Sequence, residues 1–228
     1  MRNGQSKNRT DVAKDRRKAA VSKAPAMGRR ERRAAETRLR LFRTALQLFA
    51  DRGFQNVTVE DITEGADVGK GTFFNYFESK DHVLSVMPEL QLARVRESVQ
   101  AAASGKISIY SAIHRLFLGL AEEPGRSPYL ARAVIGSFLA SDVVRKLIEH
   151  QMSQGRSMIA GVIVAGQKRG EIDRKLKSED IALQMQQILL GTTLLWSLHG
   201  EPELKTWVEN SFRHFWRAIA TKGRERKP

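Results

Sequence analysis

Apolar side chains recur at helical spacing along most of the chain, and no strand-like alternation of period two interrupts them. The first stripe, at positions i, i+4, i+7 and i+8, consists of Leu41, Ala45, Leu48 and Phe49. The sequence Asp51-Arg52-Gly53 then supplies a helix stop. No repeat of fixed length is present. The pattern predicts an all-α fold.

Residues 57–69 carry the signals of a short helix followed by a tight turn. Thr58 can cap backbone N–H groups, while Glu60 and Asp61 place negative charge in the first turn. Val57, just before the cap, can pack on Ile62 as a hydrophobic staple. Residues that interrupt a helix or tolerate a left-handed backbone follow at Gly65, Asp67 and Gly69.

A second short helix is expected from Gly69 through Phe77. Phe73 and Phe77 are four residues apart and share one face, which should pack on the preceding long helix. The other side carries Gly71, Thr72 and Asn75, flanked by Phe74 and Tyr76, with Lys70 and Lys80 at the two ends. Such an arrangement is typical of a helix-turn-helix unit, whose second helix enters the major groove of DNA; an ordinary three-helix bundle is the alternative.

Further stripes predict a larger helical body after this three-helix head. They span residues 109–120, 130–139, 144–163, 181–196 and 204–219. Proline and glycine separate them, and Pro88 predicts a kink or a break in the helix that joins head and body. The predicted organisation is a flexible basic arm (1–30), the head (31–84), the body (85–221) and a basic tail (222–228).

Charge divides unevenly along the 228 residues, which contain 39 Lys and Arg against 25 Asp and Glu. Residues 1–40 carry 14 basic and 4 acidic side chains, and residues 222–228 carry 4 and 1. The stretch between them is therefore nearly neutral, and any reading of a nucleic-acid sequence must come from a specific site within it. The arm is either a phosphate-holding segment or a solubilising leader.

Several protein classes are excluded by what the sequence lacks. Without Cys there is no disulfide framework, zinc ribbon or thiolate nucleophile, and the five His stand apart from one another. No Ser/His/Asp set, phosphate-binding glycine loop or GxSxG motif appears, so we predict no enzyme, cofactor or metal site. The longest apolar runs fall well short of the roughly 20 residues that a bilayer span needs, which makes the cytoplasm the default location.

Residues 41–84 resemble the DNA-binding domain of the TetR family of transcriptional regulators. The resemblance rests on Ala45-x-x-Leu48-Phe49, Gly53-Phe54, Thr58-Val59-x-x-Ile62, the run from Val68 to Phe77, and Ser79-Lys80. It implies DNA contacts at Thr58, Gly69, Lys70, Gly71, Thr72, Phe74, Asn75, Tyr76 and Lys80. Thr58 and Lys80 would hold phosphates, and Lys70, Gly71, Thr72 and Phe74 would lie at base edges. Gly69 stands where Ser is common in the family, and Phe74 where Tyr is common.

The resemblance also implies a body that forms a homodimer through its last two helices and encloses a small-molecule pocket. The implied dimer face is Ile181, Met185, Ile188, Leu189, Trp196, Leu204, Val208, Phe212, Phe215 and Ile219; burial of these faces within one chain is the alternative. Candidate pocket residues are His114, Phe117, Leu120, Phe138, Met152 and Trp196, each of which could instead be plain core.

The resulting expectation is a repressor that binds a pseudo-palindromic operator in double-stranded DNA. A small-molecule effector would release the repressor from that operator. Two other interpretations remain open. One is an architectural or cell-division factor of the same fold with a protein partner and no effector. The other is a nonspecific nucleic-acid binder that acts through its basic tails.

Overall fold

The computed structural model describes residues 28–140 and 142–221, except for the side chains of residues 139–144. The chain divides into two compact units, residues 1–37 and 38–228, and each is described by itself. Most of the predicted basic arm and the whole of the predicted basic tail lie outside the described residues.

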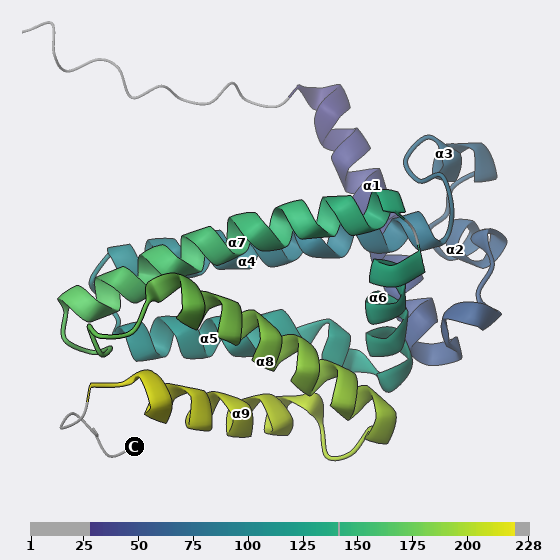
Figure 1. Ribbon diagram of the computed structural model, residues 1–228. Helices are drawn as coiled ribbons and strands as arrows, with labels where there is room; N and C mark the ends of the chain where they lie inside the picture. The colour runs from purple at the N-terminus through teal and green to yellow at the C-terminus, as the bar shows by residue number, and fades with distance from the viewer. Residues whose placement is uncertain (1–27, 141, 222–228) are drawn as a thin grey trace, which may run out of the picture. The chain divides into compact units, whose positions relative to one another are not determined.

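The described residues form helices and no strand, which confirms the predicted all-α fold (Figure 1). The α-helices are α1 (Arg29–Arg52), α2 (Val59–Gly65), α3 (Lys70–Phe74), α4 (Val86–Ala103), α5 (Ile109–Glu122), α6 (Pro128–Ala140), α7 (Asp142–Lys168), α8 (Ser178–His199) and α9 (Leu204–Ile219). Short 3-10 helices are η1 (Phe54–Asn56), η2 (Asp81–Ser85) and η3 (Pro124–Arg126). None of the described helices is both long and apolar enough to cross a bilayer.

Local signals account for the bounds of several elements. Helix α1 begins at Arg29, well before the apolar stripe that starts at Leu41, and ends before Gly53, whose φ of 79° is easiest for glycine. The break predicted at Pro88 lies just before it, where η2 gives way to α4. Pro88 then occupies the first turn of α4, where the missing N–H has no helical partner to lose.

Residues 38–228 contain two hydrophobic cores. The first joins the later part of α1 to α2, α3, η2 and the first turn of α4, and it also takes in Leu130 and Val134 from α6. The second is formed by α4, α5, α7, α8 and α9, with Ala131 of α6. Figure 1 shows α4 and α7 side by side, with α9 running back along α5 and α8. Helix α6 therefore contributes to both cores and connects the head to the body.

Candidate DNA-binding interface

A reciprocal capping box fixes the start of α2, as the sequence predicted. The Thr58 hydroxyl accepts a hydrogen bond from the Asp61 backbone N–H at 3.1 Å, and the Asp61 carboxylate accepts from the Thr58 backbone N–H at 2.7 Å. The Asp61 carboxylate also accepts from the Thr58 hydroxyl at 2.6 Å, and this bond, followed by the one from the Thr58 backbone N–H, lowers the pKa of Asp61. Val57 and Ile62 are both buried, as the predicted staple requires.

The turn between α2 and α3 has the left-handed residue that the sequence indicated. Asp67 has a φ of 51°, and the Val68 backbone N–H reaches back to the Thr63 carbonyl at 3.0 Å. Gly69 is the cap of α3, in extended conformation, and supplies no side-chain hydrogen bond. Helix α3 therefore begins without the hydroxyl cap that a Ser at this position would supply.

Helix α3 has the orientation predicted from its aromatic spacing. Phe73 and Phe77 are buried in the head core with ring centroids 5.6 Å apart, whereas Phe74 is 51% exposed. Regular α-helix ends at Phe74, but the Phe77 backbone N–H still donates to the Phe73 carbonyl, so one further helical turn continues. Gly71 and Asn75 are exposed and Thr72 is half-buried.

Gly71 leaves the backbone of α3 accessible from outside. A Cβ added to Gly71 would meet no other atom of the chain within 4 Å. The absent side chain therefore serves no close packing inside the protein. An external partner would therefore have room to approach the helix backbone at this position.

The two lysines that bracket α3 are already engaged within the head. The Lys70 ammonium forms an ion pair with the Glu60 carboxylate on α2. Lys80 Nζ donates to the carbonyls of Phe54 and Val57, both at 2.8 Å, and lies 4.4 Å from the centroid of the Phe54 ring. Lys80 thus connects the C-terminal side of α3 to η1, a contact that the sequence did not predict. A phosphate contact by Lys80 stays a prediction.

The six predicted pocket residues do not gather around one cavity in the described part of the chain. Phe117 and Trp196 are buried in the body core, with Leu120 packed against it, while Phe138 packs against the head core instead. His114 faces α9, where its ring lies 4.8 Å from that of Phe212 and 3.9 Å from the Glu209 carboxylate. Met152 is half-buried on α7.

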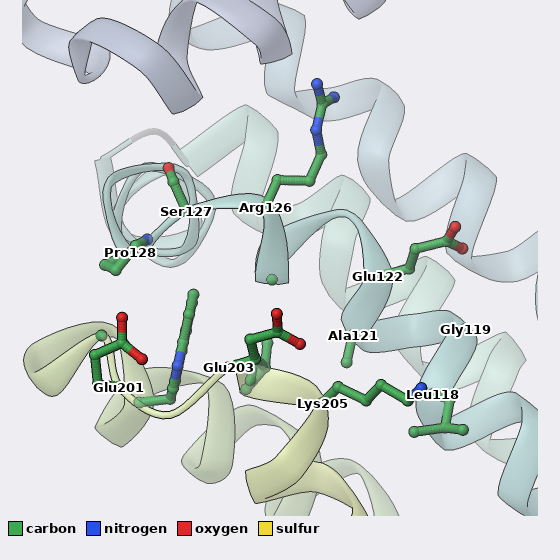
Figure 2. Close-up of a pocket in the computed structure, with 14 residues that line it drawn as sticks. Leu118, Gly119, Ala121, Glu122, Arg126, Ser127, Pro128, Glu201, Glu203 and Lys205 are labelled. Atoms are coloured by element: carbon green, nitrogen blue, oxygen red, sulfur yellow. The ribbon is translucent and has the colours of Figure 1, made fainter.

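A crevice of about 720 Å³ lies between the end of α5, η3, the start of α6 and the connection from α8 to α9. Trp196 is the one predicted pocket residue that lines it, and the Trp196 indole N–H donates to the Pro202 carbonyl at 2.8 Å. Figure 2 shows Glu201 and Glu203 on the α8–α9 side, across from Ser127 and Pro128. A second crevice, of about 460 Å³, separates η1 from α6.

Most side chains of the predicted dimer face are buried within the chain itself. Ile188 and Leu189 are partly buried against the chain's own core. The other eight side chains are buried in it: Ile181, Met185, Trp196, Leu204, Val208, Phe212, Phe215 and Ile219. The stripes on α8 and α9 pack on the rest of the body, as the alternative of burial within one chain expects for these eight. A dimer contact by them stays a prediction.

A different apolar face is exposed on α8. Five leucines of this helix are 40% to 64% exposed: Leu183, Leu190, Leu194, Leu195 and Leu198. Four of them, at i, i+7, i+11 and i+15, lie along one side of the helix, and Leu195 flanks them. Sequence analysis passed over these residues because it followed only the strongest stripe of α8. A second apolar stripe on the same helix is the signal that could have found them.

Helix α2, the turn and α3 together present a small-residue helix face with a neighbouring aromatic ring and positive charge. This arrangement defines a helix-turn-helix DNA-binding protein.

Comparisons with known proteins agree with this class. Residues 41–87 match the family model "Bacterial regulatory proteins, tetR family". The HTH-type transcriptional regulator TcmR of Streptomyces glaucescens is 36% identical over 96 residues, which cover 40% of this chain and 42% of TcmR. The HTH-type transcriptional regulator EthR of Mycobacterium tuberculosis is 26% identical over 200 residues, covering 83% of this chain and 90% of EthR.

A solved structure extends the likeness over the body. The Thermus thermophilus FadR repressor, in complex with lauroyl-CoA, superposes with a TM-score of 0.59 at 25% identity, covering 84% of this chain and 99% of that one. Residues 41–87 are therefore a DNA-binding domain of the TetR type, and the comparisons support a helix-turn-helix transcriptional regulator similar to TetR-family proteins.

Proposed function

We propose that this regulator is a repressor that binds a pseudo-palindromic operator as a homodimer and leaves it when a small-molecule effector binds the body. The orientation of α3 carries the proposal: Phe73 and Phe77 are buried, and Gly71, Phe74 and Asn75 are exposed. The protein acts where its DNA is, in the cytoplasm.

The proposed DNA contacts follow from this orientation. Gly71 and Thr72 let the backbone of α3 approach base edges, and the Phe74 ring can contact a thymine methyl group. The Lys70 ammonium reaches bases at the start of the helix, with Asn75 and Tyr76 on backbone and bases at its end. Thr58 and Lys80 contact phosphates, which position the head without reading sequence. Gly69 contributes only its backbone.

The exposed leucines of α8 supply the proposed dimer surface. Contiguous exposed apolar side chains on a protein of this size favour association with a partner. A twofold axis beside α8 would bring the five leucines of two copies together and place two heads on one duplex. Two heads then read two half-sites about 34 Å apart, one helical turn of DNA.

Release by an effector is supported by the FadR structure, which is a complex with lauroyl-CoA. A ligand that fits only a form with wrongly spaced heads weakens DNA binding by its differential affinity for the two forms, typically about 1–3 kcal/mol. Lauroyl-CoA is the first probe to test on this chain.

The decisive experiment replaces Gly71 by Ala. Within the chain the new methyl group meets open space, and alanine favours a helix over glycine by about 1 kcal/mol, so the head should fold at least as well. Operator binding, measured by fluorescence anisotropy on a duplex selected from random sequences, should nevertheless weaken about tenfold or more because the methyl group meets the bases.

Gly161→Ala on α7 is the matched control, since a Cβ there also meets no other atom within 4 Å. It should leave the operator affinity unchanged. Equal affinities for Gly71→Ala and the wild type would refute the orientation of α3 on DNA. Operator binding that persists with every acyl-CoA tested, together with capture of a protein partner, would favour the effector-free factor instead.

A further inference from the structure

Three polar side chains expected to hold DNA, those of Thr58, Lys70 and Lys80, are already paired inside the head. The Thr58 hydroxyl is 2.6 Å from the Asp61 carboxylate, and Lys80 donates to two backbone carbonyls. The third pair joins Glu60, in the first turn of α2, to Lys70, the first residue of α3. Glu60 thus places an acidic group beside a lysine that is expected to meet DNA.

Glu60 lies within the proposed DNA-binding surface. It is the second residue of α2, two positions after Thr58, and Lys70 is the first residue of α3. The side chains of Lys70 and Glu60 are 57% and 62% exposed. The hydrogen bond from Lys70 lowers the pKa of the Glu60 carboxyl.

The position of Glu60 in the first turn favours α2 through the helix dipole, but that role does not require the ion pair with Lys70. Asp61, the neighbouring residue, already completes the capping box of α2. An ion pair between two exposed side chains contributes little to folding, because both charges are well solvated and two long side chains must be ordered. A carboxylate beside the DNA backbone, in contrast, repels every phosphate that approaches.

We propose that Glu60 is a specificity-determining residue, an inference that rests on the proposed function. When no operator is bound, the Glu60 carboxylate pairs with the Lys70 ammonium and keeps it from pairing with a phosphate. To pair a phosphate with Lys70, a duplex of arbitrary sequence must displace the Glu60 carboxylate. Its phosphates then still lie close to the negative charge of Glu60. A matched operator offers α3 enough base contacts to offset that cost. Glu60 thus lowers nonspecific binding more than specific binding.

The test compares Glu60→Gln with the wild type on two duplexes, the selected operator and a scrambled sequence, across a salt series. Glu60→Gln should tighten binding to the scrambled duplex about fivefold, the factor expected when the freed Lys70 charge meets a phosphate a few ångströms away in water. Operator affinity should rise less, so the specificity ratio falls. Because Lys70 becomes available to phosphate, the slope of log affinity against log salt should steepen by about one.

Two further variants separate the pair from a general charge effect. Glu64→Gln removes an exposed carboxylate on the same helix, outside this ion pair, and should change scrambled-duplex affinity by less than twofold. In a Lys70→Ala background, Glu60→Gln should have no larger effect than Glu64→Gln. Unchanged circular dichroism and melting temperature confirm that each variant is folded.

Either of two results would overturn the proposal. One is an equal effect of Glu60→Gln with and without Lys70, which would reduce Glu60 to a surface charge. The other is a selective loss of operator affinity, which would mean that Glu60 itself accepts a hydrogen bond from a base such as cytosine. Failure of the wild type to prefer any duplex would instead refute the proposed function, so the two failures are distinct.

Discussion

Helices α8 and α9 are neighbours of similar apolar content, yet they use it differently. Helix α9 buries one clean stripe, with Val208, Phe212 and Ile219 in the body core and polar residues outside. Helix α8 buries Ile181, Met185 and Trp196 in the same core and exposes leucines on another side. A helix with one apolar face is satisfied by one core, whereas a helix with two such faces needs a second surface to cover the other.

The largest expected effect comes from emptying the buried stripe of α9. Phe212→Ala removes a ring that contacts Phe117 at a centroid distance of 5.1 Å and Tyr110 at 5.3 Å. We expect the free energy of unfolding to fall by about 3–5 kcal/mol, since the surrounding core cannot fully collapse onto the space. Urea denaturation of the wild type and variant at equal protein concentration measures this loss. A loss below about 1 kcal/mol would mean that α9 is not held by its apolar stripe.

A smaller effect, of another kind, is expected on the exposed face of α8. Leu194→Glu combined with Leu198→Glu should cost about 2–3 kcal/mol of dimer free energy, because two charges would be buried between copies. Analytical ultracentrifugation should show monomers at concentrations where the wild type is dimeric, with an unchanged far-ultraviolet spectrum. Asn210→Glu, on the exposed side of α9, is the control and should remain dimeric. An unchanged dimer in the double leucine variant would place the interface elsewhere.

The contact between the two helices provides a more modest test. Thr192 Oγ1 and Ser211 Oγ are 3.0 Å apart, a hydrogen bond between α8 and α9 at the edge of the core. Thr192→Val should lower the free energy of unfolding by about 1 kcal/mol, since it leaves the Ser211 hydroxyl without this partner. Adding Ser211→Ala should recover part of the loss. Strictly additive losses in the double variant would show that the two hydroxyls do not interact.

The smallest effect concerns the start of α8. The Glu179 carboxylate accepts hydrogen bonds from its own backbone N–H and from the Ser178 hydroxyl, and these lower its pKa from the usual 4.5. A folded-state pKa below the unfolded one adds stability that is present above pH 4.5 and is lost as the pH falls through the folded value. The melting temperature of the wild type should therefore exceed that of Glu179→Gln at pH 7, and the difference should shrink below pH 4.5. A difference that grows on acidification would contradict this sign.

The head was predictable because its signals are local. The Thr58 cap, the left-handed Asp67 and the inward pair Phe73 and Phe77 each depend on residues within a few positions of one another, and the structure confirms all three. The engagement of Lys80 was not predictable in this way. Its carbonyl partners lie 23 and 26 residues away, and only the folded path of η1 brings them within hydrogen-bond distance.

In the body, too, local features were predictable from the sequence and contacts between distant segments were not. Its helices and their turns followed from periodicity, glycine and proline, since each depends on short-range backbone preference. Periodicity also stated correctly that the stripes of α8 and α9 are buried, but it carries no information on what buries them. Whether a stripe meets its own chain or a second copy depends on how five helices pack together. Tertiary structure decided that, by filling the core with the strongest stripes and leaving the weaker leucine face of α8 exposed.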